Sequence, residues 1–300
     1  MKSKDKSFLN SHKDNPDWGF LDKKMNYLNL RGHLFSFEKP RIMGILNLSP
    51  DSFYDGGRYS ESSDILVRVK KMIDEGADFI DIGAFSSRPG AKEISEKEEL
   101  GRLLKPVNEI RKNFPDIYLS IDTFRSGIAR IMVEDFEIDM INDISAGDLD
   151  QNMFSVIADL QVPYIMMHMK GNPDKMQESP VYGNVVKELV IYLAKKIQIL
   201  NQMGVNDLIA DPGFGFGKTL DHNYEILGSL DVFSLLKVPL LVGLSRKSMI
   251  YKLLGNSPDD ALIGTTAAHT IALLKGVDIL RVHDVKAASE VIKVVEKLND

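Results

Sequence analysis

The chain has 300 residues, enough for one large domain or two ordinary ones, and 44% of them are hydrophobic, enough for a substantial core. The formal net charge is −6 with no long basic stretch, which argues against a nucleic-acid partner. No apolar run approaches the ~18 residues of a membrane-spanning helix. There is no cysteine for a disulfide, a thiolate zinc site or a cysteine nucleophile, a composition typical of cytoplasmic proteins.

The N-terminal part is predicted to hold a tail and a hairpin. Residues 1–24 alternate charged with small polar groups and lack the apolar core of a secretory signal, so they are expected to be a polar tail. Residues 27–37 alternate across Gly32, the pattern of a short β-hairpin, and Pro40 ends it. No linker or shift in composition divides the rest of the chain, so residues 25–300 are expected to form a single domain.

Short apolar, β-branched runs then alternate with helical patterns. The eight runs begin near Ile42, Phe79, Ile117, Met140, Pro163, Leu208, Pro239 and Val277. Residues 65–73 place apolar side chains at helical spacing, and Gly76 follows as a C-cap. The alternation predicts a parallel sheet, and eight repeats over about 250 residues predict a (β/α)8 barrel. A doubly wound open sheet is the alternative, because periodicity does not reveal closure.

Polar residues follow these runs, where the strands should end. In a (β/α)8 barrel that end is the catalytic face. Strand termination explains a Gly, Asn or Asp at each end, but explains poorly the joint presence of four basic residues, Arg88, Lys247, Arg281 and His283. Their positive charge suits a phosphorylated ligand, because each offers charge-assisted donors to phosphate oxygens.

Three further strand-end residues, Asp122, Asn142 and Asp211, should converge toward the barrel axis. There they could satisfy a flat heterocycle bearing several donors, with Arg281 stacked over the ring. The alternative roles are a helix N-cap for Asp122 and a turn with Pro212 for Asp211.

The remaining segments allow a metal ligand but argue against nucleotide and zinc sites. Asn47 could add an oxygen ligand to a Mg²⁺ ion that bridges a phosphate, although a turn cap is its ordinary role. Residues 211–218 lack the G-x-x-x-x-G-K-[ST] spacing of a phosphate loop. His168, among methionines, is expected to be a satisfied barrel histidine. Residues 49–57 and 86–91 are rich in Gly, Pro and Ser and are expected to act as lids.

Eight segments together resemble the dihydropteroate synthases of folate biosynthesis. They are MGILNLSPDSF (43–53), SSRPG (86–90), SIDT (120–123), NDIS (142–145), MHM (167–169), DPGFGFGK (211–218), SRKS (245–248) and RVHDV (281–285). They follow that family's order and span about four fifths of the chain, which makes the resemblance specific.

The resemblance implies a (β/α)8 enzyme that joins (7,8-dihydropterin-6-yl)methyl diphosphate to 4-aminobenzoate with Mg²⁺ as cofactor, as a homodimer and a sulfonamide target. The catalytic residues would be Asp122, Lys247, Arg281, His283 and Arg88, and the metal ligand Asn47. Substrate would be bound by Phe53, Ser87, Asp122, Asn142, Met167, Asp211, Phe216, Lys247, Ser248, Arg281 and His283. Within that set the aminobenzoate pocket would be shaped by Phe53, Ser87, Lys247 and Ser248.

Residue chemistry fits a dissociative substitution, because an aromatic amine is already a free nucleophile and the sequence offers no strong general base. Two departures concern the aminobenzoate side: Phe85 stands where the family has an acidic residue, and Ser87 where it has threonine. Phe85 would either narrow that pocket or pack under the loop. The alternatives are a pterin-dependent methyltransferase domain, which has no use for a diphosphate cluster, and a non-catalytic pterin-binding paralogue.

Overall fold

The N-terminal hairpin is present as predicted. The computed structural model describes residues 27–48, 62–85, 94–171 and 180–298, so the expected tail lies outside it. Strands β1 (Tyr27–Leu30) and β2 (His33–Ser36) pair antiparallel. Arg31 and Gly32 between them have φ values of 52° and 79°, and positive φ at both central residues is the turn geometry that matches the twist of a hairpin.

Eight parallel strands form the second sheet, in the order β8-β7-β6-β5-β4-β3-β10-β9. They are β3 (Arg41–Asn47), β4 (Phe79–Gly83), β5 (Tyr118–Asp122), β6 (Met140–Asp143), β7 (Tyr164–Met167), β8 (Leu208–Asp211), β9 (Leu241–Val242) and β10 (Ile279–Val282). A parallel bridge between Ala210 and Leu240 joins β8 to β9. The sheet therefore closes on itself, which confirms the barrel over the open sheet, and each strand begins within two residues of its predicted start.

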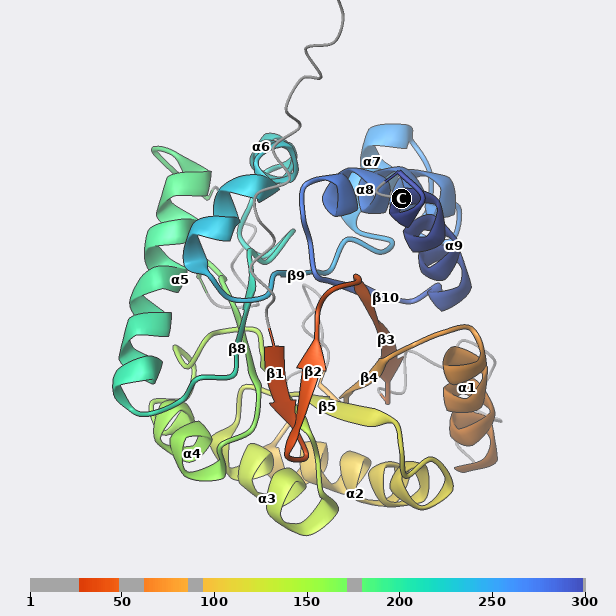
Figure 1. Ribbon diagram of the computed structural model, residues 1–300, viewed down its shortest axis with the longest axis vertical. Coiled ribbons are helices and arrows are strands. Elements are labelled where there is room, and N and C mark those ends of the chain that lie inside the picture. Colours follow the sequence, from red (N-terminus) through yellow and green to blue (C-terminus); the bar gives the residue numbers. More distant parts are fainter. Residues whose placement is uncertain (1–26, 49–61, 86–93, 172–179, 299–300) are drawn as a thin grey trace, which may run out of the picture.

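Helices follow the strands and surround the barrel (Figure 1). They are α1 (Ser62–Asp74), α2 (Glu96–Asn113), α3 (Ser126–Phe136), α4 (Met153–Leu160), α5 (Val185–Gln202), α6 (Leu220–Gly228), the 3-10 helix η2 (Leu230–Leu236), α7 (Ser248–Leu254), α8 (Leu262–Leu274) and α9 (Val285–Glu296). Helix α1 buries Ile65, Val69 and Met72, the apolar stripe predicted from their spacing. Within the described ranges, no helix combines the length and the apolar character needed to cross a bilayer.

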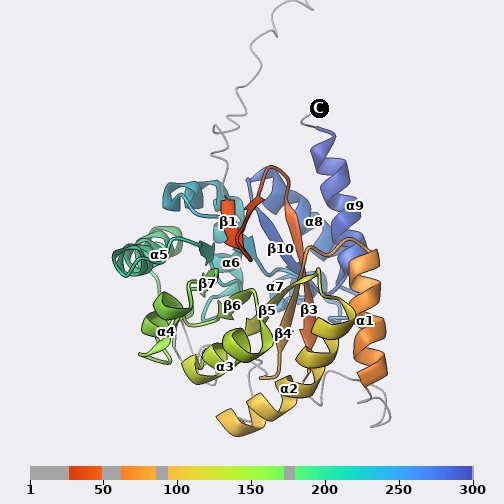
Figure 2. The same ribbon diagram turned by 60° about the horizontal axis from the view of Figure 1, so that its bottom comes forward.

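The hairpin plugs the amino end of the barrel, as the side view shows (Figure 2). Leu28, Leu30 and Phe37 are buried against residues at or near the start of seven strands: Met43, Phe79, Met140, Ile165, Ile209, Leu241 and Ile279. This apolar cluster seals one end of the strands. The opposite, carboxyl ends are therefore the face at which side chains can meet a ligand.

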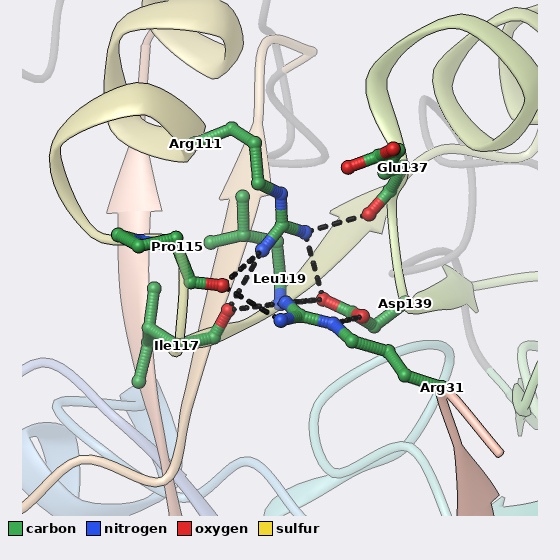
Figure 3. A network of polar contacts seen from close by, with 7 residues as sticks. All are labelled: Arg31, Arg111, Pro115, Ile117, Leu119, Glu137 and Asp139. Carbon is green, nitrogen blue, oxygen red and sulfur yellow. Dashed lines mark hydrogen bonds and ion pairs between the residues drawn. The ribbon is translucent and has the colours of Figure 1, made fainter.

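A polar network fastens the hairpin to the barrel (Figure 3). Arg31 of the hairpin turn and Arg111 of α2 both donate to the buried carboxylate of Asp139, from Nη2 at 2.9 and 2.8 Å. Leu119 N adds a third donor at 2.7 Å. The two guanidinium groups also donate to the carbonyl oxygens of Pro115, Ile117 and Glu137, whereas Arg111 Nε is buried without a hydrogen-bond partner among the described residues.

Candidate active site

The strand register brings four polar or small residues into one row at the carboxyl ends. Asn47 on β3 pairs with Gly83 on β4, Gly83 with Asp122 on β5, and Asp122 with Asn142 on β6. A Cβ at Gly83 would stand 3.6 Å from Asn47 Oδ1 and 3.7 Å from Asp122 Oδ2. Parallel pairing therefore makes neighbours of side chains that the chain separates by some twenty to forty residues.

Arg281 of β10 reaches across the mouth to two carboxylates. Its Nε donates to Asp81 Oδ2 at 2.6 Å and its Nη2 to Asp122 Oδ2 at 2.7 Å. Burial lowers the pKa of Arg281, but the attraction of Asp81 and Asp122 more than offsets it, so the guanidinium stays charged. Asp81 was not among the predicted site residues. Its signal was a carboxylate in the middle of the apolar run FIDIG.

Asp122 belongs to this site and does not cap a helix. The N-cap of α3 is Arg125, without a side-chain hydrogen bond. Burial raises the pKa of Asp122 to about 7; Arg281 opposes the rise, and nearby Asp81 adds to it. Burial destabilises the anionic form of this carboxylate, so a positive charge that approaches it would stabilise that form.

Asp211 and Lys247 form the opposite side of the mouth. Asp211 Oδ1 accepts a hydrogen bond from Gly213 N at 2.7 Å, so Asp211 does stabilise the turn after Pro212. Lys247 Nζ donates to Phe214 O and lies 4.6 Å from the centre of the Phe216 ring. Burial lowers the pKa of Lys247 to about 8, while attraction to Asp211 opposes the change. Asp211 is thus both a turn residue and a charge partner of Lys247.

Lys218 faces inward and organises the loop after β8. Lys218 is only 4% exposed, and its amine donates to the carbonyl oxygens of Gly213, Phe216 and His168 at 2.7, 3.1 and 3.2 Å. It also lies 3.1 Å from His168 Nδ1. Burial, together with Lys218, lowers the pKa of His168 to about 3, so the ring is neutral and accepts from the amine. Lys218 is therefore no phosphate lysine, and His168 is the satisfied barrel histidine that the sequence predicts.

The alternating glycines of this loop let it lie against the loop after β7. Gly213 has φ +70°, and a Cβ there would stand 2.1 Å from His168 O. Gly217 has φ +64°, and a Cβ there would stand 2.4 Å from Lys170 O. Any side chain at either position would separate the two loops and with them the acceptors of Lys218.

His283 follows β10 and differs from the expectation that it adds positive charge. Its backbone N donates to Ser245 Oγ at 3.2 Å. Burial, with repulsion from Arg281 and Arg246, lowers the pKa of His283 to about 4. Without ligand the ring is neutral near pH 7, so it offers a hydrogen bond and not a full charge. Arg246, which precedes Lys247, pairs with Asp284 at 2.7 and 2.9 Å.

Phe85, the departure from the family pattern, packs against the end of β5. Its ring meets Phe124 edge to face with centroids 5.3 Å apart, and the guanidinium of Arg125 lies 5.9 Å from its centre. Arg125 is paired with the buried Glu99, which also accepts from Thr123 Oγ1 at 2.8 Å. The loop under which Phe85 was expected to pack lies outside the described residues, so both expectations for Phe85 stay predictions.

The other predicted site residues fall into two groups. Met167 is buried at the end of β7, whereas Asn47, Phe216 and Ser248 are half-buried. Phe53, Ser87 and Arg88 lie outside the described residues, as do both expected lids. In the described part of the chain, no three His, Cys, Asp or Glu side chains are grouped to hold a metal ion.

The fold agrees with the comparisons with known proteins. Residues 43–283 match the family described as pterin binding enzyme. That span is well over half of the chain, so the chain belongs to the pterin-binding enzyme family.

Within that family, the similar proteins include dihydropteroate synthases. The Haemophilus influenzae protein of that name is 43% identical over 85% of this chain and 92% of its own length, and the Escherichia coli K12 protein 41% identical over 89% and 94%. The Yersinia pestis dihydropteroate synthase, solved with a sulfonamide drug complex, superposes with a TM-score of 0.85 at 38% identity, covering 91% of this chain and 99% of that chain. The resemblance predicted from eight motifs is confirmed.

Proposed function

We propose that this chain acts as a dihydropteroate synthase, forming 7,8-dihydropteroate and diphosphate from (7,8-dihydropterin-6-yl)methyl diphosphate and 4-aminobenzoate. The carrying observation is that Asp122, Asn142 and Asp211 meet Lys247 and Arg281 at one barrel mouth, in a chain 41–43% identical to enzymes of that name. The Xanthomonas albilineans dihydropteroate synthase, solved with 7,8-dihydropteroate, shares the fold at a TM-score of 0.81 and 34% identity.

The pterin would be held by hydrogen bonds that these side chains leave open. Asp122 and Asp211 each use one oxygen within the protein, through Arg281 and Gly213, and keep the other as an acceptor. Lys247 uses one of its three hydrogens on Phe214 O. The two carboxylate acceptors beside the Lys247 donor suit a flat heterocycle that carries several N–H groups and a carbonyl.

The diphosphate would lie against Arg281, His283 and Arg88. Asn47 suits a Mg²⁺ ion there, because Mg²⁺ keeps most of its waters and needs only one or two protein oxygens besides phosphate. Asn47 Oδ1 stands at the end of β3 beside Asp122, which is where a strand-end ligand would meet a substrate. A bound Mg²⁺ would neutralise the charge that develops on the leaving diphosphate.

In the proposed reaction, the bond between the pterin methylene and the diphosphate oxygen breaks first, and the electron pair leaves with the diphosphate. The methylene left behind is cationic, and the carboxylate of Asp122 stabilises it. The amine nitrogen of 4-aminobenzoate then forms the new C–N bond and releases a proton. Phe53, Ser87, Lys247 and Ser248 would shape the pocket that presents this amine, and a sulfonamide would compete for it.

Diphosphate release from purified protein, with Mg²⁺ and pterin diphosphate, tests this proposal. We expect diphosphate release that depends on 4-aminobenzoate and is lost in Arg88→Ala. Arg130→Ala is the control and should retain release, since Arg130 bonds with Glu134 and Asp159 on the outer face. Positional isotope exchange in the diphosphate without aminobenzoate would support the dissociative order. Pterin diphosphate binding without release would favour the non-catalytic paralogue.

We also propose a homodimer formed through helices α7 and α8. Their outer faces carry exposed apolar side chains, Leu253, Leu254, Ile263, Ile271 and Leu274, in place of the polar surface that a solvent-facing helix has. Sedimentation should show a dimer that Ile263→Glu dissociates. Leu34→Glu on the hairpin is the matched control, since Leu34 is 78% exposed and Ile263 84%. A cytoplasmic location stays a prediction.

A further inference from the structure

The buried carboxylate of Asp81 has a place in the fold that stability does not explain. Asp81 is the third residue of β4 and is 0% exposed. Its Oδ1 is sealed from solvent with no hydrogen-bond partner among the described residues. A buried, incompletely satisfied carboxylate costs free energy, and an apolar side chain of similar size at such a barrel position is usually as stable or more so.

The two groups that Asp81 does contact both belong to the proposed pterin site. Its Oδ2 accepts from Asn142 Nδ2 at 2.9 Å and from Arg281 Nε at 2.6 Å. These side chains come from β6 and β10, on opposite sides of β4 in the sheet order. One oxygen atom in β4 thus ties together two distant strands that present substrate-binding groups.

The contact with Asn142 decides which end of its amide faces the mouth. A carboxylate facing a guanidinium has acceptors only, so the amide must turn its NH₂ group toward Asp81. Its Oδ1 then points away from Asp81, and no described residue donates to it. Without that carboxylate the amide could rotate by half a turn and present a donor in place of an acceptor.

The contact with Arg281 fixes the plane of the guanidinium. Asp81 accepts from Nε and Asp122 accepts from Nη2, so carboxylates on two adjacent strands bond to two edges of one planar group. A guanidinium held at two edges cannot rotate about its own axis, so its plane keeps one orientation.

We propose that Asp81 is a positioning residue that sets which hydrogen-bonding group Asn142 presents and in which plane Arg281 lies. It thereby selects a heterocycle with an N–H donor opposite Asn142 and a face parallel to Arg281. This inference rests on the proposed function, because the heterocycle is the pterin. Asp81 itself does not need to touch the substrate.

Exchange of the pair Asp81 and Asn142 tests the inference, with calorimetric binding of the pterin diphosphate as the readout. In Asp81→Asn the amide at position 81 no longer locks Asn142, and in Asn142→Asp two carboxylates face each other; each should weaken binding about tenfold to a hundredfold. The double variant restores one donor facing one carboxylate and keeps an acceptor toward the mouth. Since Asp81 Oδ2 also accepts from Arg281 Nε, the new amide NH₂ cannot restore that second contact, so we expect the double variant to recover part of the lost affinity and to bind more tightly than either single variant.

Further measurements separate positioning from a general loss of structure. In Asp81→Asn the KM for 4-aminobenzoate should change less than about threefold, whereas the KM for the pterin diphosphate rises with the dissociation constant. Asp278→Asn is the control, a buried carboxylate at the amino end that accepts from Leu240 N at 2.9 Å; its pterin binding should not change.

Two results would overturn the inference: unchanged pterin affinity in Asp81→Asn, or a double variant that binds no better than the weaker single variant. Both results leave the proposed function standing. If the unaltered protein fails to bind the pterin diphosphate, the proposed function and the inference fall together.

Discussion

The two ends of the barrel both pair aspartate with arginine, but at one end the pairing stabilises the fold and at the other it leaves groups open for a ligand. At the amino end, Asp139 accepts from Arg31, Arg111 and Leu119 N, and both arginines also donate to backbone carbonyls. At the carboxyl end, Asp122 accepts one hydrogen bond, from Arg281, and its pKa is raised to about 7. A carboxylate with both oxygens engaged holds a structure in one state, whereas a carboxylate with one open oxygen keeps binding capacity for a ligand.

The largest expected effect is on activity at the carboxyl end. Asp122→Asn keeps the size of the side chain but removes the negative charge proposed to stabilise the cationic methylene. We expect kcat/KM to fall about 10³-fold. The melting temperature should stay the same or rise, because a half-buried and incompletely paired charge is lost. A fall in activity of less than tenfold would contradict the proposed role.

The matching change at the amino end should have the opposite profile. Asp139→Ala leaves two arginines and one backbone N–H without their acceptor, and we expect the free energy of unfolding to fall by about 3–5 kcal/mol. Urea denaturation measures this. The folded protein should keep its kcat/KM within about twofold, because the network lies at the sealed end. Equal losses of stability in Asp122→Asn and Asp139→Ala would contradict the comparison of the two ends.

A smaller effect on activity is expected from Lys218, which supports the loop beside Lys247. Lys218→Met leaves three carbonyl oxygens without a donor and loosens the loop that carries Phe214 and Phe216 beside Lys247. We expect kcat/KM for the pterin diphosphate to fall about tenfold to a hundredfold, mainly through KM. Lys195→Met, on the exposed face of α5, is the control and should leave both constants unchanged.

The smallest effect is a pH dependence of the unaltered protein. Asp122 is protonated below about 7 and Lys247 loses its proton above about 8, so kcat/KM for the pterin diphosphate should fall on both sides of a maximum between them, by up to about tenfold per pH unit. In Asp122→Asn the acid limb should vanish. A profile that stays flat from about pH 5 to 9 would exclude both groups as the titrating ones.

The candidate site was predictable to the extent that it lies at strand ends. Asn47, Asp122, Asn142 and Asp211 each stand at or next to the last residue of a strand, so an apolar run followed by a polar residue locates them. Asp81 lies within its strand, and only its contacts with Arg281 and Asn142 reveal its place in the site. His283 counts as basic by residue type, but its neutral state depends on neighbours that the sequence does not place beside it.

The sequence by itself determined the eight alternating units, the hairpin and the end of each strand at which polar groups gather, because these depend on local periodicity and turn chemistry. Only the tertiary structure decided which groups share hydrogen bonds. Closure of the sheet sets β10 beside β3, so that Arg281 meets Asp81, 200 residues earlier in the chain. The surroundings of Asp122, Lys247 and His283 set their charges, because desolvation depends on everything packed around a group.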